Sequence, residues 1–185
     1  MEDNVVRTER LTMRRAEVRD LGPLNDILSN PEAMRYWSTP PHASLHQTRE
    51  WLKGMMASPE TESDDFVVEY EGRVIGKAGF WRYPEIGYIL HPDAWGRGLA
   101  TECLEALIDR VFIRTDLDAI IADVDPRNAA SLRLLQKLGF RETHRATGTI
   151  LIGEEWCDSV YLALSRDAWA CRRGLASRAA DARLD

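Results

Sequence analysis

The sequence predicts a mixed α/β protein built around a single sheet. Segments rich in β-branched and aromatic residues lie in the first 90 residues and again over 119–124 and 156–164, and apolar residues at helical spacing separate them. This order of strands, then strand, helix, strand, helix and strand, is typical of one sheet with helices packed on it. A chain of 185 residues has the length of one domain, and no repeat or low-complexity linker divides it.

The first half of the chain is expected to combine strands with three helical segments. Pro31 suits the first position of a helix, Ser44 is a candidate N-cap, and Glu71-Gly72 separates two β-rich runs as a hairpin turn would. The expected elements are a strand over 11–15, a helix over 18–29, a one-turn helix over 31–37, a helix over 44–56, an acidic loop over 59–65, and a hairpin of strands over 66–70 and 73–81.

The second half is expected to alternate strands and helices. Gly139 is placed to end a helix as a C-cap glycine, and Gly87 inside a strand indicates a bulge or a close backbone approach. The expected elements are a strand over 85–90, a loop over 91–95, a helix over 98–114, a strand over 119–124, a helix over 128–138, a strand over 156–164, and a polar tail that is capable of forming a helix.

Composition and charge exclude several classes of protein. Lys and Arg number 24 against 30 Asp and Glu, a net charge of −6 that argues against a nucleic-acid partner. No apolar run is long enough to span a membrane, and the acidic start does not resemble a signal peptide, so we expect a cytoplasmic protein. Three scattered cysteines predict reduced thiols, and four histidines without zinc-ligand spacing predict no metal.

A glycine-rich loop that leads into a helix is the main functional signal. The strand over 85–90 runs into residues 91–101, where Gly96 and Gly98 precede a predicted helix. The first N–H groups of a helix have no acceptor within the helix and suit a phosphate, and glycines allow a ligand to approach the backbone. An ordinary strand-to-helix turn is the alternative interpretation.

Two familiar phosphate-binding motifs do not fit this loop. No Gly-x-x-x-x-Gly-Lys-Ser/Thr run is present, which argues against a nucleoside triphosphatase. The run from Gly96 to Thr101 lacks the third glycine of a dinucleotide fingerprint, and Asp118, 20 residues beyond Gly98, precedes the next strand instead of ending it. A dinucleotide enzyme is therefore a distant alternative.

Five segments, in order along residues 7–168, resemble the GNAT superfamily of N-acetyltransferases. Trp95-Gly-Arg-Gly98-Leu-Ala100 is similar to its acyl-CoA loop, Gln/Arg-x-x-Gly-x-Gly/Ala, with Trp95 where Gln or Arg is usual. That departure is similar to the branch that acetylates the N-termini of ribosomal proteins. The other matching segments are residues 8–14, 34–37, 128–140 and 156–162.

The resemblance implies a GNAT domain over 1–168, with a tail over 169–185. Its central twisted mixed sheet would have splayed fourth and fifth strands, here 85–90 and 119–124, with acetyl-CoA in the gap. The residues that the resemblance places at acetyl-CoA are Tyr88, Ile89 and Leu90, which pair with pantetheine; Trp95, Gly96, Arg97, Gly98, Leu99, Ala100 and Thr101, around the pyrophosphate; and Asn128 and Ser131, on its other side. Asn128 is also a candidate N-cap.

Candidate catalytic residues follow from the chemistry of amine acetylation. An amine must lose a proton before it attacks, and Glu85 is the first candidate base, ahead of Asp158 and Glu102. Backbone N–H groups near Ile89 and Leu90 suit the oxyanion. The superfamily commonly has a Tyr four residues before the exit glycine to protonate the thiolate, but Leu135 stands there, so Ser131 or Tyr161 is the candidate substitute.

The acceptor side is predicted from an aromatic turn and a carboxylate. Tyr36 and Trp37 are candidates for an aromatic wall, with core packing of Trp37 as the alternative, and Asp158 is a candidate to orient the ammonium. The predicted function is acetyl transfer from acetyl-CoA to a primary amine, either a protein N-terminus or a small molecule, by a monomer or homodimer. Because Leu135 replaces the usual acid, the alternative is an acyl-CoA-binding module or sensor.

Local charge refines the view of phosphate ligands. Residues 126–145 contain five basic residues against one acidic residue, beside the helix expected to face the cofactor. Residues 60–71 contain six acidic residues and no basic one, which favours a cationic acceptor or a solvated loop.

Overall fold

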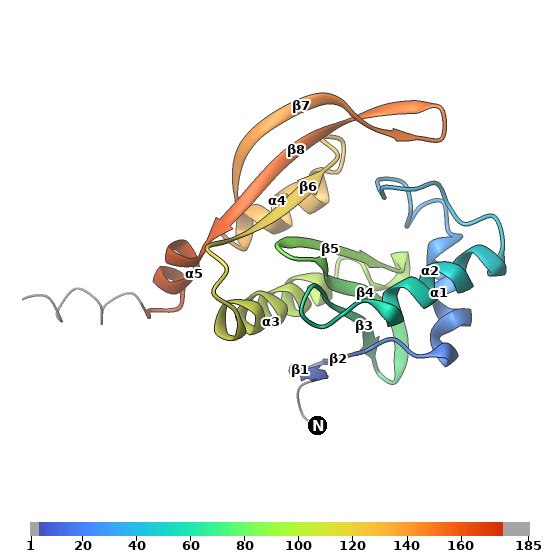
Figure 1. The fold of residues 1–185 in the computed structure, drawn as a ribbon, viewed down its shortest axis with the longest axis horizontal. Coiled ribbons are helices and arrows are strands. Elements are labelled where there is room, and N and C mark those ends of the chain that lie inside the picture. Colours follow the sequence, from blue (N-terminus) through green and yellow to red (C-terminus); the bar gives the residue numbers. More distant parts are fainter. Residues whose placement is uncertain (1–3, 176–185) are drawn as a thin grey trace, which may run out of the picture.

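One twisted sheet organises the whole structure. The computed structural model describes residues 4–175, and in this part of the chain eight strands form one sheet in the order β1-β2-β3-β4-β5-β6-β8-β7 (Figure 1). Neighbouring strands are antiparallel except β5 and β6, which are parallel. The strands are β1 (Val5–Arg7), β2 (Leu11–Arg14), β3 (Asp64–Tyr70), β4 (Arg73–Arg82), β5 (Glu85–Leu90), β6 (Ala119–Val124), β7 (Arg141–Ile152) and β8 (Glu155–Ser165).

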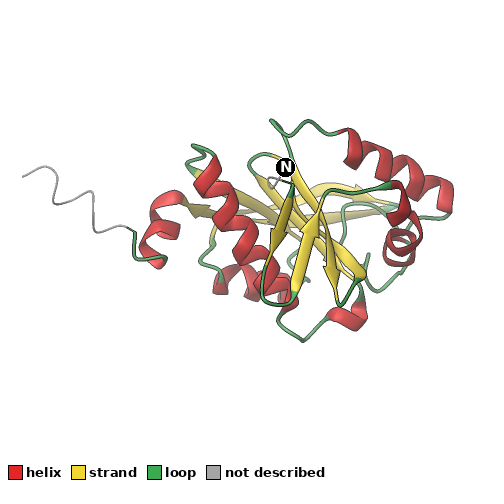
Figure 2. Cartoon of the chain, turned by 90° about the horizontal axis from the view of Figure 1, so that it is seen from below, coloured by secondary structure: helices red, strands yellow, loops and turns green. Residues whose placement is uncertain are grey.

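Helices cover both faces of this sheet (Figure 2). On one face the main core joins α3 to the strands, and on the other a second cluster joins α1 and α2 to Val67 and Ile89. The helices are α1 (Leu21–Leu28), α2 (Leu45–Ala57), α3 (Leu99–Arg114), α4 (Ala129–Lys137) and α5 (Arg166–Arg172), with short 3-10 turns η1 (Val18–Asp20) and η2 (Pro92–Ala94). Within the described residues, no helix is long and apolar enough to cross a membrane.

The strands β5 and β6 meet at one end only. Glu85 pairs with Ile121, and the Ile121 N–H donates to the carbonyl of Pro84 at 3.1 Å. Beyond this point the two strands diverge, as Figure 1 shows. The splayed pair predicted from the sequence is therefore confirmed, although β1 makes these the fifth and sixth strands of the chain.

The structure differs from the expected elements in three places. Residues 31–37 form turns instead of a one-turn helix. The Asn30 side chain accepts from the N–H groups of Glu32 and Ala33, and the backbone hydrogen bonds that follow do not form a regular helical series. β1 is too short to give a periodic pattern. β7 was not expected because its residues are mostly exposed and polar, and it is held by pairing with β8.

Caps and the C-terminal helix fix the ends of several elements. Ser44 accepts from the Gln47 N–H at the start of α2, which confirms the predicted cap. At the other end of the chain, α5 crosses the expected boundary at residue 168. Trp169 is buried, its ring stacks on Phe112 with centroids 5.1 Å apart, and its indole donates to Asp109 at 2.7 Å. The remainder of the predicted tail, 176–185, lies outside the described residues.

Candidate active site

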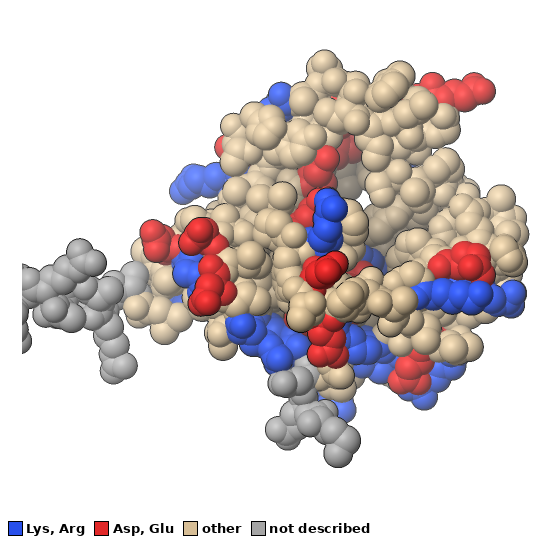
Figure 3. All heavy atoms as spheres, viewed as in Figure 1, with Lys and Arg blue, Asp and Glu red and all other residues tan. Residues whose placement is uncertain are grey.

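A pocket of about 650 Å³ lies where β5 and β6 diverge. It is lined from α2 and the preceding turn on one side and from β7 and β8 on the other. Figure 3 shows the molecular surface hollowed between these two parts, with acidic side chains beside the hollow. Four predicted site residues are brought together here: Tyr36, Trp37, Glu85 and Asp158.

The alternation of side chains along β5 connects this pocket to the opposite face of the sheet. Ile89 packs in the cluster of α1 and α2, whereas Tyr88 and Leu90 contribute to the main core. Glu85 and Gly87 share the face of Ile89 and line the pocket. The gap between β5 and β6 therefore lies between the pocket on one face and the environment of Tyr88 on the other.

A pair of hydroxyl groups spans from β5 to α4 on that second face. The hydroxyl oxygens of Tyr88 and Ser131 lie 2.6 Å apart. Burial raises the pKa of Tyr88 to about 12, so its hydroxyl stays protonated at neutral pH, although the hydrogen bond with Ser131 opposes this shift. Asn128 accepts from the Ser131 N–H at 3.1 Å, which confirms its predicted N-cap role and fixes the start of α4.

The glycine loop begins α3 as the sequence predicted. Gly96 and Gly98 have φ of 70° and 76°, a region that favours glycine, and Gly98 is the N-cap of the helix. The N–H groups of Leu99, Ala100 and Thr101 occupy the first helical turn, where no carbonyl of the same helix lies one turn earlier. These amides can hold an anion.

The N-terminal strand region holds this loop in place through Glu102. Its carboxylate accepts from the Thr8 hydroxyl at 2.5 Å, the Arg10 N–H at 2.9 Å and the Arg10 Nε at 2.6 Å. Burial opposes ionisation, but these donors outweigh it and hold the pKa of Glu102 below its usual value. Arg10 also donates to the carbonyl of Arg97 at 3.0 Å. Glu102 thus anchors the loop, and its carboxylate is already occupied.

Two side chains of the loop point to other parts of the protein. Arg97 donates to the Tyr70 hydroxyl at 2.8 Å and lies 4.6 Å from the centre of its ring, beside a second pocket under the β3–β4 turn. The Trp95 indole donates to the carbonyl of Leu90 at 2.9 Å. That carbonyl already has a donor, and the carbonyl of Ile89 lies against Gly76 of β4, so Tyr88 is left as the main candidate for backbone pairing along the open edge of β5.

Comparison with known proteins shows the family of the chain. The family model for the acetyltransferase (GNAT) domain matches residues 10–141. The chain belongs to the GNAT acetyltransferase family. It is 35% identical over 144 residues to the uncharacterized N-acetyltransferase p20 of Bacillus licheniformis, covering 73% of this chain and 81% of that protein.

Other GNAT relatives have named acceptors. The [ribosomal protein uS5]-alanine N-acetyltransferase of Escherichia coli is 27% identical over 88% of this chain and 91% of its own. The spermidine N(1)-acetyltransferase of that organism is 28% identical over 137 residues, which cover 69% of this chain and 71% of that protein. A crystal structure of a GNAT acetyltransferase from Bacillus anthracis superposes with a TM-score of 0.78 at 26% identity, covering 88% of this chain and 99% of that one, which confirms the predicted fold.

Neither Leu135 nor the candidate proton donor Tyr161 lines the pocket of this GNAT domain. Leu135, at the position where the superfamily commonly has Tyr, is buried in the main core. Tyr161 stacks on His144 with ring centroids 4.3 Å apart and does not line the pocket. Ser131 does not line the pocket either, and its hydroxyl lies beside that of Tyr88 on the other face of the sheet.

Asp123 is a pocket residue that the sequence interpretation missed. It lies on β6, two residues after the contact between Ile121 and Glu85, and remains open to solvent through the pocket. Partial desolvation raises the pKa of its carboxyl, while a hydrogen bond with Ser159 and the charge of His144 oppose the shift. A single Asp within the apolar strand AIIADV was the signal that could have found it.

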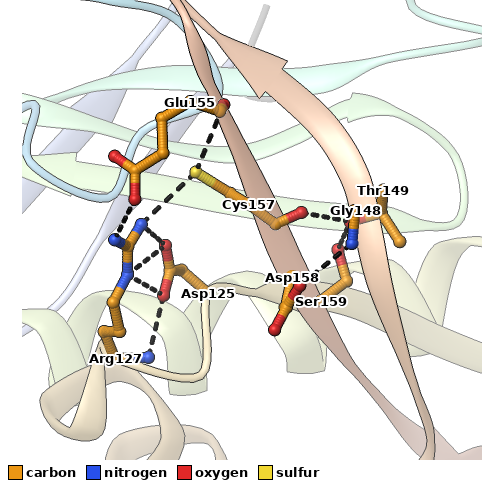
Figure 4. A network of polar contacts seen from close by, with 8 residues as sticks. All are labelled: Asp125, Arg127, Gly148, Thr149, Glu155, Cys157, Asp158 and Ser159. Carbon is orange, nitrogen blue, oxygen red and sulfur yellow. Dashed lines mark hydrogen bonds and ion pairs between the residues drawn. The ribbon is translucent and has the colours of Figure 1, made fainter.

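The basic segment beside α4 is partly neutralised within the protein. Arg127 contacts Asp125 and Glu155, each at 2.6 Å, and lies 3.3 Å from the sulfur of Cys157 (Figure 4). Arg145 pairs with Glu142 at 2.8 Å. The local excess of positive charge expected from the sequence is therefore smaller than the residue count implied.

Proposed function

We propose that this chain is an acetyl-CoA-dependent N-acetyltransferase that acts on a primary amine by direct attack on the thioester. The observation that carries the proposal is the single contact between β5 and β6. It leaves a gap with the acidic pocket on one face of the sheet and the Tyr88–Ser131 hydroxyl pair on the other. Base and acid candidates thus lie on the two sides of one opening.

The residues around the gap fit acetyl-CoA. Beyond Glu85, β5 has no strand partner on the side of β6 within residues 4–175, so its backbone can pair with an extended ligand. A side chain at Gly87 would project into open space, so the approach to the pocket is clear. The first-turn amides of α3 suit a pyrophosphate, since the positive end of the helix dipole adds to their donor capacity.

The proposed reaction divides the proton transfers between the two faces. The amine nitrogen bonds to the thioester carbonyl carbon, the carbon–sulfur bond breaks, and coenzyme A leaves as a thiolate that takes up a proton. Glu85 or Asp123 accepts the proton released by the amine, directly or through water. Ser131 donates to the sulfur, and the Tyr88 hydroxyl supports Ser131 at 2.6 Å.

The acceptor is proposed at the level of a primary amine, since the named relatives act on spermidine and on a protein N-terminus. The test is acetylation of a panel of amines and N-terminal peptides with acetyl-CoA, followed by mass spectrometry. Acetylated product that forms only with both substrates supports the proposal. Absence of product with every amine contradicts it.

A binding module without turnover is the second candidate, and Leu135 is the observation that favours it. This buried side chain cannot donate a proton where the superfamily commonly has Tyr. Calorimetric titration with coenzyme A separates the candidates when it is combined with the transfer assay. Binding without transfer supports the module, whereas failure to bind contradicts both candidates.

A further inference from the structure

The pocket holds more negative charge than the protein itself balances. Asp125 is paired with Arg127, and Glu50 is paired with Lys53 at 2.8 Å. Among the described residues, three other carboxylates that line the pocket have no ion pair with Lys or Arg: Glu85, Asp123 and Asp158. A reacting amine must be neutral when it attacks, so it carries no positive charge that could balance these three carboxylates.

A buried oxygen without a partner gives an independent indication of a ligand. Asp65 lines the same pocket and is 7% exposed. Its Oδ2 contacts Lys77 Nζ at 2.8 Å, but no group within residues 4–175 donates to its Oδ1. A buried acceptor without a donor is costly, and a bound N–H group would satisfy it.

The wall above Asp65 already accommodates a cation. Lys77 Nζ lies 5.5 Å from the centre of the Trp37 ring, and Trp37, Trp51 and Tyr36 all line the pocket. Aromatic faces attract ammonium groups and also pack against methylene groups. A ligand with two charged ends and an apolar stem between them therefore matches the residues that line the pocket.

The sheet register separates the two ends of the site. Gly87, beside the gap, pairs with Gly79, and Gly79 pairs with Asp65. Two strand spacings put the backbones at Gly87 and Asp65 about 10 Å apart. One nitrogen can lie at the gap while another reaches the Asp65 region.

We propose that the acceptor is a small aliphatic amine that carries a second positive charge several methylene groups from the acetylated nitrogen. This inference rests on the proposed acetyltransferase function. The neutral nitrogen lies at the gap, near Glu85 and Asp123. The distal ammonium lies near the Asp65 carboxylate and Trp37, and Asp158 adds to the negative potential that attracts it.

The test compares two acceptors of matched length, butane-1,4-diamine and 4-aminobutan-1-ol, which differ only in the distal ammonium. We expect kcat/KM for the diamine to be at least about tenfold higher, because a charged hydrogen-bonded end is lost in the alcohol. Added salt is expected to reduce this preference, since it screens the attraction. Equal rates for the two acceptors, or a preference for peptide N-termini, would overturn the inference while leaving the acetyltransferase function intact.

Variants locate the preference within the pocket. Asp158→Asn is nearly isosteric, and its oxygen can still accept from the Gly148 N–H. We expect it to reduce several-fold the ratio of kcat/KM for the diamine to kcat/KM for the alcohol. Asp65→Asn is expected to remove most of the preference, with acetyl-CoA binding as the check that the protein is folded. Asp116→Asn, on an exposed loop outside the pocket, is the matched control.

An unchanged preference in both pocket variants would also contradict the inference. If neither acceptor nor any peptide is acetylated, the proposed function itself has failed.

Discussion

At the residue scale, the Tyr88–Ser131 pair is the proposed substitute for the tyrosine that the superfamily commonly has where Leu135 stands. Two neutral hydroxyls at 2.6 Å share one hydrogen bond, which leaves one remaining proton to donate outward. The high pKa of Tyr88, about 12, keeps the pair uncharged. If Tyr88 donates to Ser131, the Ser131 proton is directed to a leaving thiolate.

We expect Ser131→Ala to lower kcat about 100-fold, the range for removal of a positioned acid, with little change in acetyl-CoA affinity. Tyr88→Phe is expected to lower kcat less, because Ser131 keeps its own proton. Steady-state kinetics and titration with acetyl-CoA measure the two effects. If Tyr161→Phe lowers kcat more than Ser131→Ala does, the assignment of the acid is wrong.

The dependence of kcat/KM on pH distinguishes Glu85 from Asp123 as the base. A protonated carboxyl cannot accept a proton, so activity must fall as pH drops through the pKa of the base. Because partial desolvation raises the pKa of Asp123, Asp123 as the base predicts an acidic limb at a higher pH than an ordinary Asp would give. Asp123→Asn would then abolish this limb, whereas Glu85→Gln would leave it in place. The opposite pattern in kcat/KM against pH would assign the base to Glu85.

At the element scale, the glycine loop and α3 depend on a backbone conformation that only glycine adopts easily. Gly98 has a φ of 76°, so Gly98→Ala is expected to cost about 1 kcal/mol of unfolding free energy and to weaken coenzyme A binding. Gly22→Ala in α1, where no atom lies within 4 Å of the added methyl, is the control and is expected to be neutral or slightly stabilising. Urea unfolding measures both. Equal stability of the two variants would contradict the role given to Gly98.

The packing of α1 against α2 contains a buried histidine with a defined pH response. His42 contacts Thr48 at 2.9 Å, and burial lowers its pKa. The unfolded chain then binds a proton more readily than the folded chain, so stability is lost as pH falls below about 6.5. His42→Gln is expected to flatten the fall in melting temperature between about pH 7 and pH 5.5. The exposed His46→Gln should keep the wild-type slope, and an identical slope in all three proteins would contradict this account.

Elements with strong periodicity or caps could be predicted from the sequence, and elements held by their neighbours could not. The helix over 99–114 has a continuous apolar face and a glycine N-cap, so its expected position was nearly right. β7 has no buried residue and is held by its pairing with β8, which is tertiary information. In the same way, no local sequence pattern predicts that Glu85, Asp123 and Asp158 line one pocket, because they lie on three separate strands.

At the scale of the whole molecule, the sheet separates two chemical environments and joins them through one opening. The acidic pocket lies on the face of α1 and α2, and the hydroxyl pair and glycine loop belong to the side of α3 and α4. The opening exists because β5 and β6 pair only at Glu85 and Ile121. Acetyl transfer across this opening is the central claim.

The most direct test of that claim is single-turnover acetylation, with an excess of protein over acetyl-CoA and butane-1,4-diamine as the acceptor. Monoacetylated amine and free coenzyme A should appear together in equal amounts, and Ser131→Ala should slow their formation while still binding acetyl-CoA. Release of coenzyme A without acetylated amine, or binding of acetyl-CoA with no reaction against any amine, would contradict the account.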